Sequence, residues 1–394
     1  MEAKCCHVDV CGGCKFQQIP YREQVASKQA LVEALFNPHK IDPIIGSKSP
    51  WSYRGKMEFS FSQDKKGEKY LGLVMPKSRG RVFTLTECFI GFPWMAEVVC
   101  SARKWWQESR LEAFFPPKEI GSLRTLTMRS SRDGNEKMVI LTVSGNSDYA
   151  LTREELNSFT KAAKYDETTS VFLVIHMAKK KQETEFFEMH LSGPDHLKEI
   201  LCGYEFRISP RSFFQPNVNV AEVMFEKAIE ILNLTGEEKV LDLYCGMGTI
   251  GILLSKFVRQ VVGIEIAATS VADAKEAIQR LGIQNMHVYA EDVGTFLEKR
   301  GDLFIPDIVI VDPPRTGLDK KAIQSINALK PNKILYISCN PITQRENLDH
   351  FPDYQIECIA PFDPFPHTKH IENIILLSKK LTLLQTCGMI SGET

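Results

Sequence analysis

The sequence contains no apolar run approaching the roughly 20 residues that cross a bilayer, and residues 1–10 lack the apolar core of a signal peptide. It has almost no net charge, because 48 Lys and Arg residues face 49 Asp and Glu residues. Internal repeats and low-complexity tracts are also missing. These absences argue against a membrane, secreted or repeat protein. They predict a cytoplasmic protein that contacts nucleic acid only through local basic patches.

Cysteine, by contrast, is abundant, with eleven residues. In a reducing compartment these are thiols or metal ligands rather than disulfides. Cys11 and Cys14 form a C-x-x-C turn, Cys5 lies upstream, and Cys88 is the best candidate for a distant fourth ligand. Four thiolates suit either Zn²⁺ or an iron–sulfur cluster. The alternative is a set of unliganded surface cysteines.

The length of 394 residues leaves room for two or three domains, and we expect a boundary near residue 205. Residues 1–205 are predicted to be a strand-rich α+β region that begins with an amphipathic helix at 21–36, which can pack on the second region. This first region concentrates basic residues, which form either a solvated face or a phosphate-contacting groove. They are Arg54, Lys56, Lys77, Arg79, Arg81 and Lys179–Lys181.

Residues 206–394 alternate strand and helix regularly from residue 239 onward. Seven strands are predicted, at 239–243, 260–264, 286–290, 307–311, 333–338, 355–360 and 371–378. Helices are predicted near 220–232, 249–257, 268–281, 292–299 and 319–329. This alternation predicts an α/β sheet whose ligands bind at the carboxyl ends of the strands.

The turn after the first of these strands indicates a nucleoside site. Gly246 and Gly248 let the backbone approach a ligand where the strand passes into a helix. Glu265 ends the next strand, where a carboxylate can accept both ribose hydroxyls. Asp242 lies in the approach to the loop and would repel a pyrophosphate. S-adenosylmethionine carries a sulfonium and an ammonium and no phosphate, so it fits better than a dinucleotide.

Three more reactive groups lie at or near predicted strand ends. Asp312 ends the fourth strand before two prolines, where it either caps a helix or binds a ligand. Cys339 follows the fifth strand and is placed like a nucleophile. Glu372 begins the last, otherwise apolar strand and is expected to face the cleft. A thiol and a carboxylate beside a methyl donor suggest methylation at a pyrimidine C5, with the thiol adding to C6 and a base removing the C5 proton.

Residues 208–217, Ile-Ser-Pro-Arg-Ser-Phe-Phe-Gln-Pro-Asn, contain two adjacent aromatic residues followed by an amide. Phe213 and Phe214 are either core and loop residues or a base-stacking platform with Gln215 beside it. Periodicity does not decide between the two.

Taken together, the motifs resemble those of the RNA uracil-5 methyltransferase family over essentially the full length. They are Phe214–Asn217, Asp242–Gly246, Glu265, Asp312–Gly317, Ser338–Pro341 and Phe365–Glu372. The resemblance implies a class I methyltransferase fold, with Cys339 as nucleophile and Glu372 as general base. It also implies that the cofactor and target-base site includes Gln215, Tyr244, Glu265, Asp312 and, at the adenine end, Asp292.

The C-x5-C-x2-C spacing with a distant fourth cysteine is similar to the [4Fe–4S] site of bacterial ribosomal-RNA uracil-5 methyltransferases. The resemblance therefore implies a structural cluster on Cys5, Cys11, Cys14 and Cys88, and it favours 23S ribosomal RNA over transfer RNA as substrate of a monomeric enzyme. Two departures are Thr249, where relatives often have asparagine, and a chain that starts at the cysteines with no room for an N-terminal barrel.

Three other functions compete with this interpretation. A cytosine-5 RNA methyltransferase uses the same thiol chemistry but commonly carries Pro-Cys where this chain has Pro-Arg315. An amino-group methyltransferase of the Asp-Pro-Pro-Tyr type would leave Cys339 and Glu372 without a role. A non-catalytic, cluster-containing RNA-binding factor could retain the same fold, and a methyl-transfer assay on RNA separates it from the enzymes.

Overall fold

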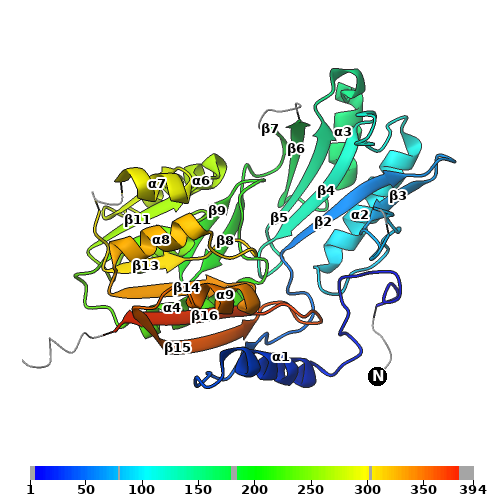
Figure 1. Cartoon of the computed structure of the whole chain (residues 1–394). Helices are drawn as coiled ribbons and strands as arrows, with labels where there is room; N and C mark the ends of the chain where they lie inside the picture. Colours follow the sequence, from blue (N-terminus) through cyan, green and yellow to red (C-terminus); the bar gives the residue numbers. More distant parts are fainter. Residues whose placement is uncertain (1–4, 79, 179–183, 301–303, 381–394) are drawn as a thin grey trace, which may run out of the picture. The chain divides into compact units, whose positions relative to one another are not determined.

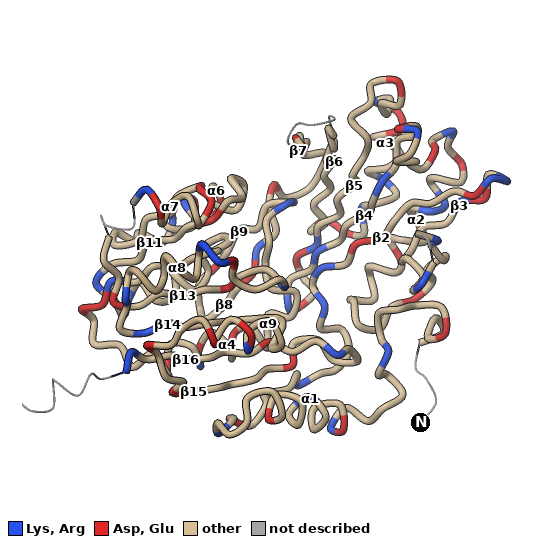
Figure 2. The backbone as a smooth tube through the Cα atoms, viewed as in Figure 1, with Lys and Arg blue, Asp and Glu red and all other residues tan. Residues whose placement is uncertain are grey.

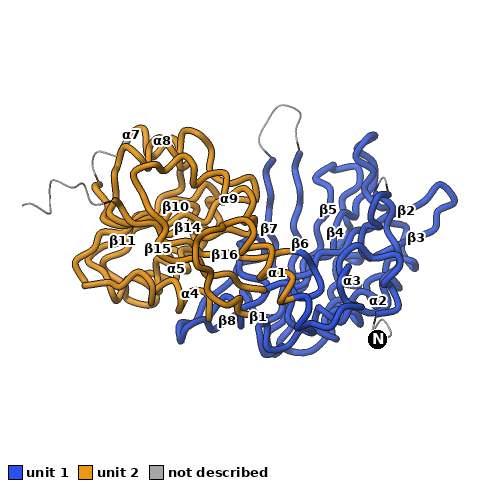
Figure 3. Tube along the Cα trace, turned by 60° about the horizontal axis from the view of Figure 1, so that its bottom comes forward, with its two compact units in different colours: residues 1–24, 46–222, 364–369 blue, residues 25–45, 223–363, 370–394 orange. Residues whose placement is uncertain are grey.

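A computed structural model describes residues 5–78, 80–178, 184–300 and 304–380 of the chain (Figure 1). The described residues belong to two compact units (Figure 3). Unit 1 comprises residues 1–24, 46–222 and 364–369, and unit 2 comprises residues 25–45, 223–363 and 370–394. These units are assembled from separated segments, whereas the sequence predicts one boundary near residue 205. Whether residues 1–205 and 206–394 fold as separate domains stays a prediction.

Unit 2 is built on a sheet with the strand order β1-β15-β16-β14-β13-β10-β11-β12. Its strands are β1 (Ile45–Gly46), β10 (Lys239–Leu243), β11 (Gln260–Glu265), β12 (Met286–Ala290), β13 (Ile308–Val311), β14 (Lys333–Ser338), β15 (Tyr354–Asp363) and β16 (Glu372–Lys379). Strands β10 to β14 pair in parallel, and β16 pairs antiparallel with both β14 and β15. The seven strands expected beyond residue 239 are all present.

Helices connect these strands in sequence. They are α4 (Val218–Leu232), α5 (Thr249–Leu254), α6 (Ala268–Arg280), α7 (Val293–Arg300), α8 (Lys320–Leu329) and α9 (Pro341–Leu348). The central strands are apolar on both faces because helices cover both sides of a doubly wound sheet, and all four residues of β13 are buried. Val32 and Phe36 of α1 (Tyr21–Phe36) lie in the same core. No helix in the described ranges is long and apolar enough to cross a membrane.

Unit 1 contains a six-stranded sheet with the order β3-β2-β4-β5-β6-β7. Its strands are β2 (Lys56–Gln63), β3 (Lys69–Gly72), β4 (Leu123–Ser130), β5 (Lys137–Ser144), β6 (Thr169–Met177) and β7 (Glu185–Ser192). Helix α2 (Pro93–Glu108) contributes Trp94, Trp105 and Trp106 to the core beneath this sheet, which α3 (Arg153–Ala163) completes. The short helix η1 (Ser147–Tyr149) and a hairpin of β8 (Leu197–Leu201) and β9 (Tyr204–Ile208) make up the rest. The predicted mixed α/β fold is therefore confirmed.

Candidate functional site

The carboxyl ends of the parallel strands bring most of the predicted site residues to one edge of the sheet in unit 2. Parallel strands point the same way, so residues that follow neighbouring strands meet at the same edge. Asp242 and Tyr244 lie at the end of β10, Glu265 ends β11, and Asp312 follows β13. Cys339 follows β14, and Glu372 is the first residue of β16, which runs in the opposite direction.

The loop after β10 turns tightly because three of its residues adopt left-handed backbone conformations. The φ angles of Tyr244, Gly246 and Gly248 are 61°, 57° and 72°. A Cβ atom on Gly248 would also lie 2.9 Å from Cε of Met286, so a side chain at this position is both strained and crowded. The loop therefore presents bare backbone at the sheet edge, as a ligand-binding turn requires.

Glu265 is oriented towards this glycine loop by two backbone amides. The Gly246 amide donates to Oε2 at 3.0 Å, and the Ala267 amide donates to Oε1 at 2.7 Å. Each carboxylate oxygen can accept a further hydrogen bond. The side chain is therefore held beside the loop with acceptor capacity left for two hydroxyl groups.

Asp292 is an exposed residue that precedes α7. Its Oδ1 accepts hydrogen bonds from the Thr295 amide at 2.9 Å and the Thr295 hydroxyl at 3.0 Å, so it acts as a helix cap. Burial, then the charges of Asp319 and Asp292, raise the pKa of Tyr244 to about 12. Tyr244 and Asp292 thus lie within electrostatic range of one another, and the adenine-binding role of Asp292 stays a prediction.

Three acidic side chains make this edge of the sheet strongly favourable for a cation. Burial raises the pKa of Asp312 to about 7. Burial and the nearby Asp312 raise the pKa values of Asp242 and Glu372 well above their usual range. Asp242 is 1 % exposed, and neither of its carboxylate oxygens has a hydrogen-bond partner among the described residues. A positively charged ligand here would offset the desolvation cost of these carboxylates.

Cys339 and Glu372 flank the last pair of the β14–β16 ladder. Ser338 pairs with Asn373, so Cys339 directly follows one member of this pair and Glu372 directly precedes the other. Burial, and then the charges of Glu372 and Asp312, raise the pKa of the Cys339 thiol to about 11. At neutral pH the site therefore holds a protonated thiol near a carboxyl group.

Arg315 is a member of this site that the sequence interpretation did not assign a role. Its charge opposes the upward pKa shifts of both Cys339 and Glu372, which places it near both groups. Its Nη2 donates to Nδ1 of His370 at 2.8 Å. Both residues lie within the quoted motifs Asp312–Gly317 and Phe365–Glu372, which was the signal available in the sequence.

Gln215 belongs to unit 1, and its role at the target base stays a prediction. It is half-buried and lines a small cavity with Lys56, Arg129 and Phe214. Phe214 is 6 % exposed and packs 5.6 Å from the ring of Phe206, whereas Phe213 is 56 % exposed. The two aromatic residues therefore separate into one core residue and one surface residue.

The four predicted ligand cysteines surround one cavity of about 250 Å³ in unit 1. Burial, followed by the charges of Cys88, Cys11 and Cys5, raises the pKa of Cys14 to about 12. The four sulfur atoms are thus close enough for ionisation of one to oppose ionisation of the others. Among the described residues, no three His, Cys, Asp or Glu side chains lie close enough to hold a single metal ion. The ten described cysteines are free thiols, and Cys387 lies outside the described residues.

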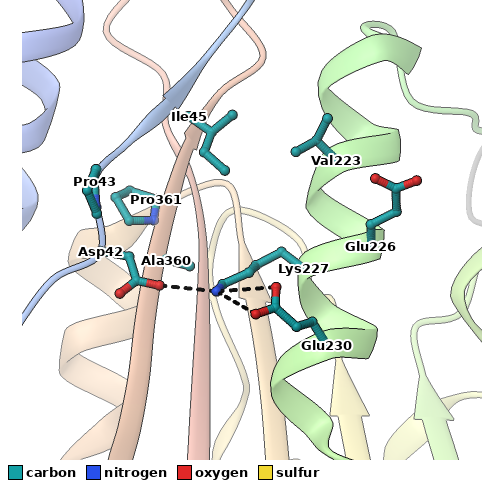
Figure 4. A pocket seen from close by; sticks show the side chains of 9 residues that line it. All are labelled: Asp42, Pro43, Ile45, Val223, Glu226, Lys227, Glu230, Ala360 and Pro361. Atoms are coloured by element: carbon teal, nitrogen blue, oxygen red, sulfur yellow. Dashed lines mark hydrogen bonds and ion pairs between the residues drawn. The ribbon is translucent and has the colours of Figure 1, made fainter.

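Unit 2 contains a cavity of about 460 Å³ between β15, α4 and residues 42–45 (Figure 4). The ammonium group of Lys227 lies 3.5 Å from carboxylate oxygens of both Asp42 and Glu230. The described residues that line the cavity include neither Cys339 nor Glu372. This cavity is therefore separate from the strand-end site.

Comparisons with known proteins agree with this geometry. Residues 174–380 match the family model described as tRNA (uracil-5-)-methyltransferase. An uncharacterized RNA methyltransferase of Protochlamydia amoebophila is 44 % identical over 403 residues, covering 96 % of this chain and 91 % of that protein. One from Chlamydia muridarum is 37 % identical over 388 residues, covering 95 % and 98 %.

Among solved structures, the chain resembles the tRNA (uracil-54, C5)-methyltransferase of Pyrococcus abyssi, which was crystallised with S-adenosyl-L-homocysteine. The TM-score is 0.71 at 24 % identity, and the match covers 93 % of this chain and 86 % of that one. At this level of identity the likeness shows a shared fold.

Proposed function

Because the chain belongs to the tRNA (uracil-5-)-methyltransferase family of S-adenosylmethionine-dependent RNA methyltransferases, we propose that it converts a uridine in RNA to 5-methyluridine through a covalent adduct. The observation that carries this proposal is the proximity of Cys339 and Glu372, which flank the last pair of the β14–β16 ladder and influence one another electrostatically. Carbon C5 of uracil is too weak a nucleophile to take a methyl group unaided. A thiol and a base on neighbouring strands are the two groups that the reaction needs.

Cys339 would begin the reaction by losing its thiol proton to solvent and adding the resulting thiolate to C6 of the uracil. The new S–C6 bond moves the electron pair of the C5–C6 double bond to C5 and the O4 carbonyl, which makes C5 an enolate-like nucleophile. S-adenosylmethionine supplies the methyl group, whose bond to sulfur breaks as its bond to C5 forms. Glu372 then removes the C5 proton, the C5–C6 double bond reforms, and the sulfur of Cys339 leaves as thiolate.

The strand-end carboxylates would hold the methyl donor. A bound sulfonium or ammonium would favour the ionised forms of Asp242 and Asp312, whose pKa values burial raises, and Glu265 has acceptor capacity for the ribose hydroxyls. Ionised carboxylates at these positions would repel the phosphate groups of a dinucleotide cofactor. Burial and the charge of Asp312 raise the pKa of Glu372, which makes its carboxylate a stronger base than an exposed one.

Replacing Glu265 by alanine is expected to weaken S-adenosylmethionine binding by about 1–3 kcal/mol, the usual value of charge-assisted hydrogen bonds. Isothermal titration calorimetry with the purified variant measures this loss directly. Glu298→Ala, which removes an exposed carboxylate on α7 paired with Lys321, is the matched control and should bind the donor like the unaltered enzyme. Equal affinity in the Glu265 variant would show that this residue is only a solvated strand end.

We favour 23S ribosomal RNA as the substrate, on the basis of the four-cysteine arrangement, with transfer RNA as the alternative. Unit 1 offers cationic groups for RNA despite the balanced charge of the chain (Figure 2). Burial, and then the charge of Arg129, lowers the pKa of Lys56 to about 8, with Arg54 also nearby. Such a group would bind a phosphate and gain a counter-charge. Arg79 and Lys179–Lys181 of the predicted basic set lie outside the described residues.

The decisive experiment supplies purified enzyme and labelled S-adenosylmethionine with unmodified 23S ribosomal RNA and, separately, with unmodified transfer RNA. Digestion to nucleosides should show labelled 5-methyluridine in the ribosomal RNA. Labelled 5-methylcytidine would instead establish the cytosine-5 alternative. No labelled nucleoside in either RNA would favour a non-catalytic RNA-binding protein. Mapping 5-methyluridine in the RNAs of a deletion strain then identifies the position.

We also propose a structural [4Fe–4S] cluster on Cys5, Cys11, Cys14 and Cys88. A single zinc ion needs its ligands within about 2.3 Å of one point, whereas a cubane keeps four thiolates apart around its own body. The four described thiols line one cavity, which is the observation that supports this proposal. The cluster would cross-link residues 5–14 to the segment that carries Cys88.

Anaerobically purified protein is accordingly expected to be brown and to contain about four irons per chain. Cys88→Ser should lose most of the iron and the visible absorbance, because it removes one of the four ligands. Cys100→Ser alters a half-buried free thiol on α2 in the same unit and should retain both. Stoichiometric zinc without visible absorbance, or full cluster retention in Cys88→Ser, would contradict the assignment.

A further inference from the structure

The helix that follows the nucleophile, α9, places polar side chains along one face that points into the protein. Asn340, which caps the helix, and Thr343, Gln344 and Asn347 are spaced by three, one and three residues, which puts them on a common face. Gln344 is 0 % exposed, although glutamine is rarely fully buried. A fully buried amide must make its hydrogen bonds inside the protein, so its partners define what this face holds.

Gln344 joins the two strands that carry the catalytic groups. Its Nε2 donates to the carbonyl oxygen of Tyr336 on β14 at 2.9 Å and to that of Asn373 on β16 at 3.2 Å. Its Oε1 accepts a hydrogen bond from Nδ2 of Asn373 at 2.8 Å. Asn373 is also 0 % exposed, and it directly follows Glu372 in the chain.

The side chains of Gln344 and Asn373 therefore link the strand that precedes Cys339 to the strand that begins with Glu372. Helix α9 begins two residues after Cys339. The backbone N–H of Gln344 donates to the carbonyl oxygen of Asn340 at 3.1 Å, which ties the position of Gln344 to the turn that follows Cys339. The other end of the bridge holds the backbone of Asn373, one peptide unit from Glu372. One side-chain hydrogen bond to β14 and two to β16 therefore constrain the distance between these strands near the end of their ladder.

The same helix face also holds the loop that carries Arg315. Nδ2 of Asn340 and the hydroxyl of Thr343 both donate to the carbonyl oxygen of Arg315, at 3.1 and 3.3 Å. Oδ1 of Asn347 accepts from the Leu318 amide at 2.8 Å. Gly317, with a φ of 78°, lies so close that a Cβ there would be 2.5 Å from Oδ1 of Asn347.

We propose that Gln344 and Asn373 are positioning residues that set the separation of Cys339 and Glu372, so that the thiolate reaches C6 and the carboxylate reaches the C5 proton of the same base. The inference rests on the proposed covalent reaction, because it assigns the pair a role only through those two groups. Neither amide touches the substrate. Their removal should therefore slow the steps that need Cys339 and Glu372 in register and should leave the binding of the methyl donor unchanged.

The test uses Gln344→Met and Asn373→Leu, which keep side-chain size but abolish the amide–amide hydrogen bond, together with the double variant. Each single change is expected to lower kcat at least tenfold, with KM for S-adenosylmethionine within twofold of the unaltered value. The double variant should be little worse than either single one, since both changes break the same bridge. The fraction of enzyme found as covalent RNA adduct at steady state should also change, because the two chemical steps are affected unequally.

The matched control is Asn285→Leu. The Asn285 amide also cross-links backbone in unit 2, donating to the carbonyl oxygens of Ser255 at 2.7 Å and Val258 at 3.0 Å, but it lies before β12 at the opposite end of the strands. This variant should lower the thermal unfolding temperature without lowering kcat of the folded enzyme. If Gln344→Met and Asn373→Leu behave in the same way, the pair is only structural and the inference is wrong. An unaltered enzyme that methylates no RNA would instead overturn the proposed function itself.

Discussion

Cys339→Ala is expected to lose methyl transfer by on the order of 10⁴-fold or more and to form no covalent enzyme–RNA species. The alanine cannot add to C6, so C5 never gains the electron density that attacks the methyl group. Donor binding should survive, because the acidic groups near the glycine loop are untouched. The measurement is incorporation of labelled methyl into RNA, with denaturing electrophoresis to detect the adduct.

Cys358→Ala provides a close control for this experiment. Cys358 is a half-buried thiol on β15 in the same unit, and burial, with the charge of Asp42 next, raises its pKa to about 11, similar to that of Cys339. Its removal should leave methyl transfer unchanged, because it lies away from the strand ends that form the site. Residual activity of Cys339→Ala near the unaltered rate would mean that the reaction proceeds without this thiol.

Glu372→Gln should produce the opposite phenotype with respect to the adduct. Glutamine keeps the shape of the side chain but cannot accept the C5 proton, so the methylated base stays attached to Cys339. A methylated, covalently bound RNA species should therefore accumulate and survive denaturing electrophoresis, while turnover falls to near zero. Mass spectrometry of the linked nucleotide establishes that the methyl group has already been delivered.

We also expect the Glu372→Gln variant to change the pH dependence of adduct formation. The charge of Glu372 raises the pKa of Cys339, second only to burial, so a neutral glutamine should lower that pKa. The thiolate is the reactive form, and its fraction rises as pH passes the thiol pKa. Adduct formation in Glu372→Gln should therefore rise at a lower pH than in the unaltered enzyme. An unchanged profile would show that the charge of Glu372 does not control the Cys339 pKa, and turnover at the unaltered rate would show that another group is the base.

The strand-end residues could be predicted from sequence because their signals are local. Asp242, Glu265 and Asp312 each follow a short apolar run, and the topology of a doubly wound sheet brings the ends of such runs together whatever the details of packing. Glu372 was recognisable as a carboxylate at the start of an apolar strand. The antiparallel pairing of β14 with β16, which brings Glu372 near Cys339, is a long-range property that no single segment encodes.

Other features depend on tertiary contacts and were missed for that reason. Gln344 is an ordinary amide in a short helix, and only the fold shows that it is fully buried against Asn373. Helix α2 and the β8–β9 hairpin were absent from the predicted elements. Charged residues interrupt their apolar residues, which obscures the periodicity that would reveal them. For Asp292 the sequence predicts cofactor binding, and the structure shows in addition that its side chain caps helix α7.

The interleaving of the two units limits how this gene can be cut or recombined. The chain passes between units at residues 24–25, 45–46, 222–223, 363–364 and 369–370. A fragment that starts at residue 223 would lack Val32 and Phe36, which are 0 % and 1 % exposed in the catalytic core. Each such side chain contributes about 1.5–3 kcal/mol by its burial. Exchange of catalytic modules between relatives therefore has to carry residues 25–45 along with the C-terminal half, and a single crossover would leave a hybrid with mismatched core surfaces.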